Sequence, residues 1–165
     1  METREIIVCM EEICEGVVTL LTTELPSVIE EINTERDYGI ELEDEVTIKH
    51  DSPASGFSLL GVDEYPAVFI EPLKEREEGV DEKGFQILIS GWLREEDLRY
   101  MIKKIERFAL AVKTTLKKDF TLDGIASGGV IADTDYLEPM KSKRDPTGSY
   151  ISFVMDVSYI NYKGE

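Results

Sequence analysis

The sequence predicts a single α+β domain over residues 1–165, with a mixed or antiparallel β-sheet packed by an N-terminal helical segment and one long central helix. Three observations predict this class. Apolar residues recur at helical spacing in the N-terminal and central regions, they alternate with polar residues near the C-terminus, and short apolar runs lie between turn signals. With 42% hydrophobic residues, a chain of 165 residues can bury one core without disulfides.

The N-terminal region predicts two helical stretches. Apolar residues from Ile6 to Leu21 fall on one helical face. Pro26 follows at a position suited to opening a second stretch, because the first turn of a helix tolerates proline. This second stretch would turn Val28, Ile29 and Ile32 toward the core.

The middle of the chain predicts three strands. A short strand is expected at Val46–Lys49, a proline-bracketed apolar strand at 66–72, and a third strand at 85–92. Turn-forming residues are dense at 50–64, and 73–83 is highly charged. We therefore expect flexible loops in both segments, the second of them joining its two strands as a hairpin-like link.

Residues 94–118 predict the long central helix. Acidic residues at 95–97 would occupy its first turn and Lys117 and Lys118 its last, which is the arrangement that the helix dipole favours. Its core face is predicted to consist of Leu98, Met101, Ile102, Ile105, Phe108, Ala109, Val112 and Leu116.

The outer side of this helix is unusually basic for so acidic a chain. Residues 94–118 hold eight basic and four acidic side chains, whereas residues 1–50 hold three basic and fourteen acidic ones. Such asymmetry between segments is typical of an interface, although a solvated helix face paired with nearby acids would look the same. The candidate interface residues are Arg99, Lys103, Lys104, Arg107 and Lys113.

Two strands are predicted to close the fold. The first covers 129–137, and the second, at 149–162, shows the clearest alternation in the chain. The apolar residues of this alternation are Ile151, Phe153, Met155, Val157 and Tyr159. A turn is expected between the two strands at 146–148.

Composition excludes several classes of function. Acidic residues outnumber basic ones 35 to 18, giving a formal net charge of −17, and this field repels the phosphates of nucleic acids. No run approaches the roughly 18 apolar residues of a membrane-spanning helix. Acidic residues within positions 1–16 break up the apolar stretch that a signal peptide needs. We therefore expect no signal peptide and a chain that starts in a cytoplasm.

The two cysteines predict neither a disulfide nor a zinc site. Cys9 and Cys14 lie five positions apart on the first helix, about 7.5 Å along its axis and on different faces. We expect both to be reduced core residues. The only histidine, His50, leaves too few ligands for zinc.

No arrangement typical of catalysis is found, and no cofactor is expected. Asp133 and Asp135 would share one face of a strand and could hold a hard cation. His50 lies beside Asp51 but lacks the context of a serine or cysteine nucleophile. An enzyme that uses these residues is the least favoured class.

Three stretches carry a resemblance to a known family. The proline-bracketed strand "EYPAVFIEP", the strand and helix of "FQILISGWLREEDLRYMIKKIERFALAVKTTL", and the closing "LDGIASGGVIADTDYLEP" and "GSYISFVMDVSYINY" occur in the order typical of that family. Together with the helical segment before them, they resemble bacteriophage tail-terminator and related head–tail joining proteins. The resemblance covers roughly residues 5–160.

This resemblance implies a structural virion protein, assembled in the host cytoplasm. Its subunits would form a ring, expected to be a hexamer, that caps the tail tube and joins it to the head–tail connector or neck. DNA would only pass through such a ring. The basic side of 94–118 could then meet acidic residues of 1–50 between subunits. The alternative is a soluble acidic regulator that binds a basic partner or mimics DNA.

Overall fold

The order of elements in the computed structural model confirms the predicted α+β class. The structure describes residues 8–36, 39–51, 65–79, 82–141 and 149–162. Its elements are α1 (Met10–Glu35), β1 (Thr47–Lys49), β2 (Ala67–Gly79), β3 (Glu82–Arg94), α3 (Leu98–Leu116), β4 (Gly128–Tyr136), β5 (Met140–Lys141) and β6 (Ser149–Tyr162).

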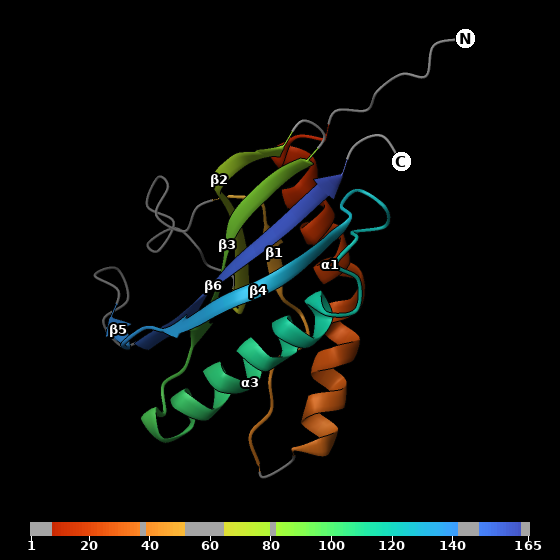
Figure 1. Cartoon of the computed structure of the whole chain (residues 1–165). Coiled ribbons are helices and arrows are strands. Elements are labelled where there is room, and N and C mark those ends of the chain that lie inside the picture. The colour runs from red at the N-terminus through yellow and green to blue at the C-terminus, as the bar shows by residue number, and fades with distance from the viewer. Residues whose placement is uncertain (1–7, 37–38, 52–64, 80–81, 142–148, 163–165) are drawn as a thin grey trace.

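The described strands form one six-stranded sheet in the order β1-β2-β3-β6-β4, with β5 paired to β6 (Figure 1). The sheet is mixed because β1 runs parallel to β2, while every other pairing is antiparallel. β3 and β6 pair along their full length, from Glu82 opposite Tyr162 to Arg94 opposite Tyr150. These two long strands form the centre of the sheet.

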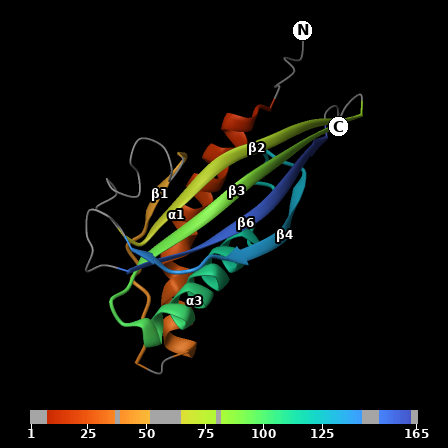
Figure 2. The same cartoon turned by 90° about the vertical axis from the view of Figure 1, so that its left-hand side faces the viewer.

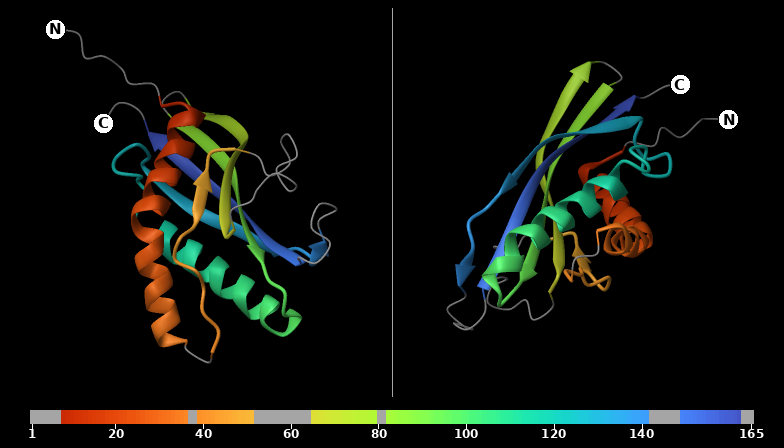
Figure 3. Two further views of the ribbon diagram at one scale, coloured as in Figure 1. Left: turned by 180° about the vertical axis from the view of Figure 1, so that it is seen from behind. Right: turned by 90° about the horizontal axis from the view of Figure 1, so that it is seen from below.

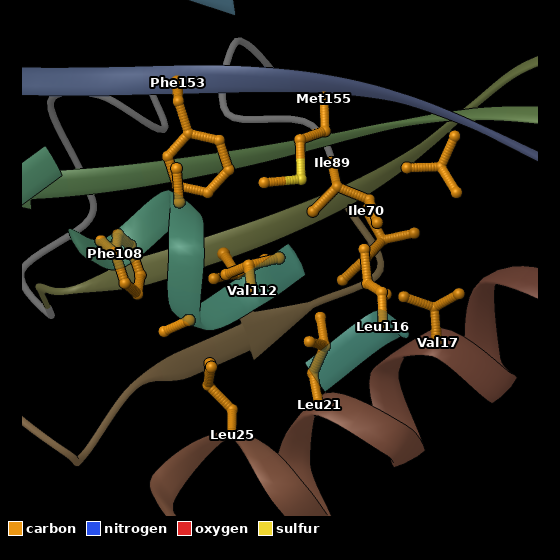
Figure 4. Close-up of a cluster of buried hydrophobic side chains, with 14 of the residues drawn as sticks. Val17, Leu21, Leu25, Ile70, Ile89, Phe108, Val112, Leu116, Phe153 and Met155 are labelled. Atoms are coloured by element: carbon orange, nitrogen blue, oxygen red, sulfur yellow. The ribbon is translucent and has the colours of Figure 1, made fainter. Parts of the chain in front are cut away.

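Both helices lie on the same face of the sheet (Figures 2 and 3). α1 packs over β1 and β2, α3 packs over β3 and β6, and the two helices contact each other. The main core fills the space between the helices and the sheet, as Figure 4 shows. Its central side chains include Val17, Leu21, Leu25, Ile70, Ile89, Phe108, Val112, Leu116, Phe153 and Met155.

The prediction of two N-terminal helical stretches was wrong, because α1 runs unbroken through Pro26. A proline inside a helix removes one backbone hydrogen bond and costs about 3 kcal/mol. The buried stripe nevertheless continues across it from Leu21 and Leu25 to Val28, so packing against the core outweighs that cost. Residues 6 and 7, where the helix was expected to begin, lie outside the described part of the chain.

The cysteines differ in environment. Cys14 is buried in the core, as expected, but Cys9 is exposed at the N-cap of α1, and both thiols are free. The helix begins only at Met10, so Cys9 precedes the stripe that faces the sheet. The prediction that Cys9 is a core residue was therefore wrong.

The predicted loop at 73–83 is for the most part strand. β2 continues to Gly79 and β3 begins at Glu82, so the two strands form a long hairpin whose charged part pairs in register from Lys74 opposite Gln86 to Glu77 opposite Lys83. Backbone pairing with β3 extends this exposed segment in spite of its polarity. Of the loop expected at 50–64, residues 52–64 lie outside the described part.

The short strand expected at Val46–Lys49 is confirmed as β1, and the C-terminal strands are confirmed as β4 and β6. All five predicted apolar positions of β6 are buried in the core. Ser152, predicted on the opposite face, is buried as well, with an exposed fraction of 2%. The expected turn at 146–148 is not among the described residues.

Part of the predicted core face of α3 was wrong. Leu98 and Ile102 are 65% and 52% exposed, whereas Ala111 and Thr115 are buried. The helix begins at Leu98 after the N-cap Asp97, so the acids at 95–97 precede its first turn. Ile102 instead borders a surface groove beside Tyr136, where the end of β4 leaves this side of the helix uncovered.

Candidate subunit interface on the outer side of α3

The five basic residues predicted as an interface all lie on α3, but they differ in what they contact. Arg99, Lys104 and Arg107 each bind an acceptor within the same chain. The side chains of Lys103 and Lys113 make no hydrogen bond or ion pair with any described residue, and of the two only Lys103 is exposed. The local excess of positive charge is therefore smaller in the fold than along the sequence.

Lys104 forms an ion pair with Glu95, which follows the last residue of β3. Glu95 also accepts hydrogen bonds from the backbone N–H groups of Glu96 and Asp97, at 3.2 and 3.1 Å. Partial burial by itself would raise the pKa of the Glu95 carboxyl, but the bonds from Lys104 and the two backbone groups lower it below the ordinary value. This ion pair ties the end of β3 to the second turn of α3.

Arg107 and Arg99 are held by local partners. The Arg107 guanidinium donates to the carbonyl oxygen of Ile40 at 2.7 Å, joining α3 to the segment that follows α1. The Arg99 guanidinium donates to Asp97 Oδ2 at 2.8 Å, and the pKa of Asp97 is lowered by this hydrogen bond. Because Asp97 also caps the helix through the Arg99 N–H at 3.0 Å, this pair stabilises the start of α3.

A second charged surface lies at the end of α1 and in the segment after it. α1 has no basic residue in its last turn, although the helix dipole favours one there. Asn33 fixes the chain that returns from α1, since its amide donates to and accepts from the backbone of Leu42 at 2.9 Å. The exposed acids of this surface are Glu30, Glu31, Glu35, Glu41, Glu43, Asp44 and Glu45.

The residues considered for catalysis do not come together. His50 follows β1 at one edge of the sheet, and its ring Nδ1 lies 3.2 Å from Glu15 on α1. Asp133 and Asp135 lie on β4 at the other edge, roughly 19 Å away across four strand spacings. Among the described residues, no three histidine, cysteine, aspartate or glutamate side chains form a group that could hold a metal ion.

Two basic residues of the predicted loop at 73–83 lie, in the structure, on the open face of the sheet, which is the face opposite the helices. Lys74 pairs with Gln86 across the β2–β3 hairpin, and Arg76 pairs with Gly84, so both lie on the face opposite the helices. The alternation of basic and acidic residues from Lys74 to Glu77 has the period of a strand. That alternation was the sequence signal that could have revealed them.

The same open face carries acidic residues at the other edge. Asp133 pairs with Asp156 and Asp135 pairs with Val154, both of which lie on the face of β6 opposite the core. Asp156 accepts hydrogen bonds from the side-chain amide of Gln86, whose nitrogen lies 2.8 Å from both carboxylate oxygens. The open face thus carries anions at β4, while at β2 it carries the cations Lys74 and Arg76 together with Glu71 and Glu78.

Neither a protein-family model nor a curated protein matches this sequence. In the part of the chain that the structure describes, neither helix combines the length and the apolarity that crossing a bilayer requires.

Proposed function

We propose that the protein is a structural virion component, a tail-terminator-like subunit whose ring caps a phage tail tube and joins it to the head or neck. The support from the fold is its α+β class and the order of strand, long helix and closing strands, which is the order in which the sequence resembles that family. In such a particle the partners are further copies of this chain, the tail tube protein and a head–tail connector or neck protein. DNA passes through the ring without specific binding.

The observation that carries this proposal is the presence of two oppositely charged surfaces on one subunit. Lys103 offers an exposed cation without a partner in the described chain, while exposed acids such as Glu31 crowd the end of α1. In a cyclic ring different patches of neighbouring subunits meet, and opposite charge is a simple way to orient them. A negative net charge of −17 also suits a channel through which DNA slides.

The test is the solution mass by light scattering over a range of protein and salt concentrations. A ring-sized species is expected, and it should weaken as salt screens the charged contact. Lys103→Glu should lower the mass at a given concentration, and Glu31→Lys in the same chain should restore it. Lys118→Glu, the same charge reversal at an exposed residue beyond the end of α3, is the matched control and should leave the mass unchanged.

A soluble acidic regulator is the second candidate function, and the exposed acids at 41–45 favour it. Such a protein would bind a basic partner through this surface and remain a monomer or dimer. A monomer at every protein and salt concentration would contradict self-assembly into a ring and support the regulator. A larger assembly that Lys103→Glu leaves unchanged would keep the ring but remove α3 from its interface.

A further inference from the structure

The sheet has two open edges within the described residues. Among the described strands β4 pairs only with β6, so its other edge has no partner there. β2 pairs with β1 only at Ala67–Phe69, so no described residue pairs with its edge from Ile70 to Gly79. Unpaired strand edges offer rows of backbone donors and acceptors to another strand.

Each edge carries one pair of like charges with the same spacing on the open face, and on β2 that pair lies between Glu71 and Glu78. Lys74 and Arg76 are two positions apart on β2, and Asp133 and Asp135 are two positions apart on β4. All four side chains are exposed, and none makes an ion pair or hydrogen bond with a described residue. Two cations and two anions with the same spacing therefore stand unpaired at opposite edges.

From these edges we infer that a second copy of this chain adds to the sheet, with β4 of one copy pairing antiparallel to the free part of β2 of the next. This inference rests on the proposed ring, and it names the strands that join its subunits. The direction follows from the order of strands, since β2, β3, β6 and β4 alternate in direction and a continued sheet places β4 antiparallel to β2.

A single register satisfies both charge pairs. If Asp133 lies opposite Arg76, then Asp135 lies opposite Lys74, because antiparallel positions rise on one strand as they fall on the other. The same register brings Tyr136 to Leu73, the extra residue at the register shift between Pro72 and Lys74, and these two side chains are 48% and 49% exposed in the subunit. The second charge pair and the Tyr136–Leu73 contact both follow from the Asp133–Arg76 pair.

The helix layer agrees with this arrangement. α1, with its acidic outer side, covers the β2 half of the sheet, and α3, with its basic outer side, covers the half next to β4. In a head-to-tail contact the acidic side of α1 in one copy therefore faces the basic side of α3 in the next. In the sheet the signs are reversed, because the basic residues lie on β2 and the acidic ones on β4. Such a contact uses two different patches and repeats from copy to copy.

Charged residues on edge strands also occur as protection against unwanted pairing. The two explanations predict opposite effects of charge changes. If the charges protect the edges, removing them increases association. If they pair between copies, Asp133→Lys with Asp135→Lys weakens association at least roughly tenfold, as does Lys74→Asp with Arg76→Asp, while the chain with all four changes recovers.

Covalent trapping tests the register directly. Leu73→Cys and Tyr136→Cys are combined in a chain with Cys9→Ser, and the oxidised protein is separated on a denaturing gel without reductant. Directly opposite residues are close enough for a disulfide. Within one copy the two positions are separated by three strand spacings, roughly 14 Å, and by about four residues along the strands, roughly 13 Å more in that direction. We expect a ladder of covalent oligomers, which reductant removes.

The matched control joins Leu73→Cys to Val130→Cys. Val130 lies on the same strand and is 58% exposed, but in this register it falls six residues, or roughly 20 Å, from Leu73. A control ladder as strong as that of the test pair would overturn the register, and the absence of both ladders would overturn edge pairing. If edge pairing fails this test but Lys103→Glu still reduces the assembled mass, the proposed ring stands without edge pairing. If the protein does not assemble at all, both the ring and edge pairing are contradicted.

Discussion

Gly91 of β3 and Phe153 of β6 are directly paired, and the ring of Phe153 occupies the space that a side chain at position 91 would need. The ring is fully buried and packs edge-on against Phe108 of α3, with ring centroids 5.6 Å apart. Because position 91 has no side chain, the Phe153 ring can lie over this glycine and contact Phe108 of α3. This contact lies at the middle of the core that holds α3 against the sheet.

Gly91→Ala should destabilise the fold by about 1–3 kcal/mol, the usual cost of adding a methyl group to a filled core. The new Cβ would clash with the Phe153 ring and also lie 3.0 Å from the ring of Phe108, so neither ring can yield easily. The free energy of unfolding in urea measures the effect. Gly128→Ala is the control, because a Cβ there meets no atom within 4 Å, and an equal loss in both variants would contradict this account.

Tyr159→Phe should leave stability unchanged or raise it by about 1 kcal/mol. The Tyr159 ring is fully buried, and its hydroxyl has no hydrogen-bond partner among the described residues. Burial raises the pKa of this hydroxyl, in agreement with an apolar environment. Urea unfolding of the two proteins is the measurement, and a loss of more than about 1 kcal/mol would show that the hydroxyl has a partner.

Glu95→Gln should destabilise the protein by about 1 kcal/mol at neutral pH, because it removes a partly buried ion pair. The pKa of Glu95 is lower in the folded than in the unfolded protein, so its contribution is complete above the unfolded value. That contribution disappears as pH falls through the folded value, below about 4.5. The difference in unfolding free energy between parent and variant should therefore vanish in acid.

Glu96→Gln is the control for this comparison. Glu96 is exposed, and its carboxylate lies 3.7 Å from Arg94 in a solvated ion pair, so the substitution should change stability little. If Glu95→Gln and Glu96→Gln have the same pH profile, the Lys104–Glu95 pair does not stabilise the junction of β3 and α3.

Only one of the two thiols should react with a thiol reagent at pH 8 in the native protein. Cys9 is exposed, whereas burial in the core, with a smaller effect of the neighbouring Glu15 charge, raises the pKa of Cys14 to about 11. Both the lack of access and the low fraction of thiolate slow the reaction of Cys14. Mass spectrometry should find one label per native chain and two in urea. Two labels in the native protein would contradict the burial of Cys14.

The sequence by itself determined most of the segments that form helices and strands, the exceptions being the continuity of α1 and the charged end of β2. The alternation in β6 and the helical period in α3 are local, because burial of one face repeats with the geometry of the element. It also revealed the basic side of α3. It could not reveal that Lys104 and Arg107 are held by Glu95 and Ile40, since these partners are distant in sequence or belong to another element.

Only the tertiary structure decided the rest. Packing on the sheet carries α1 through Pro26, and pairing with β3 turns the charged residues after Pro72 into a strand. The local patterns at both places predicted a break or a loop, because local preferences are weaker than long-range pairing and burial. The order of strands then placed Lys74 and Asp135 at opposite edges of one face, a relationship that no local pattern encodes.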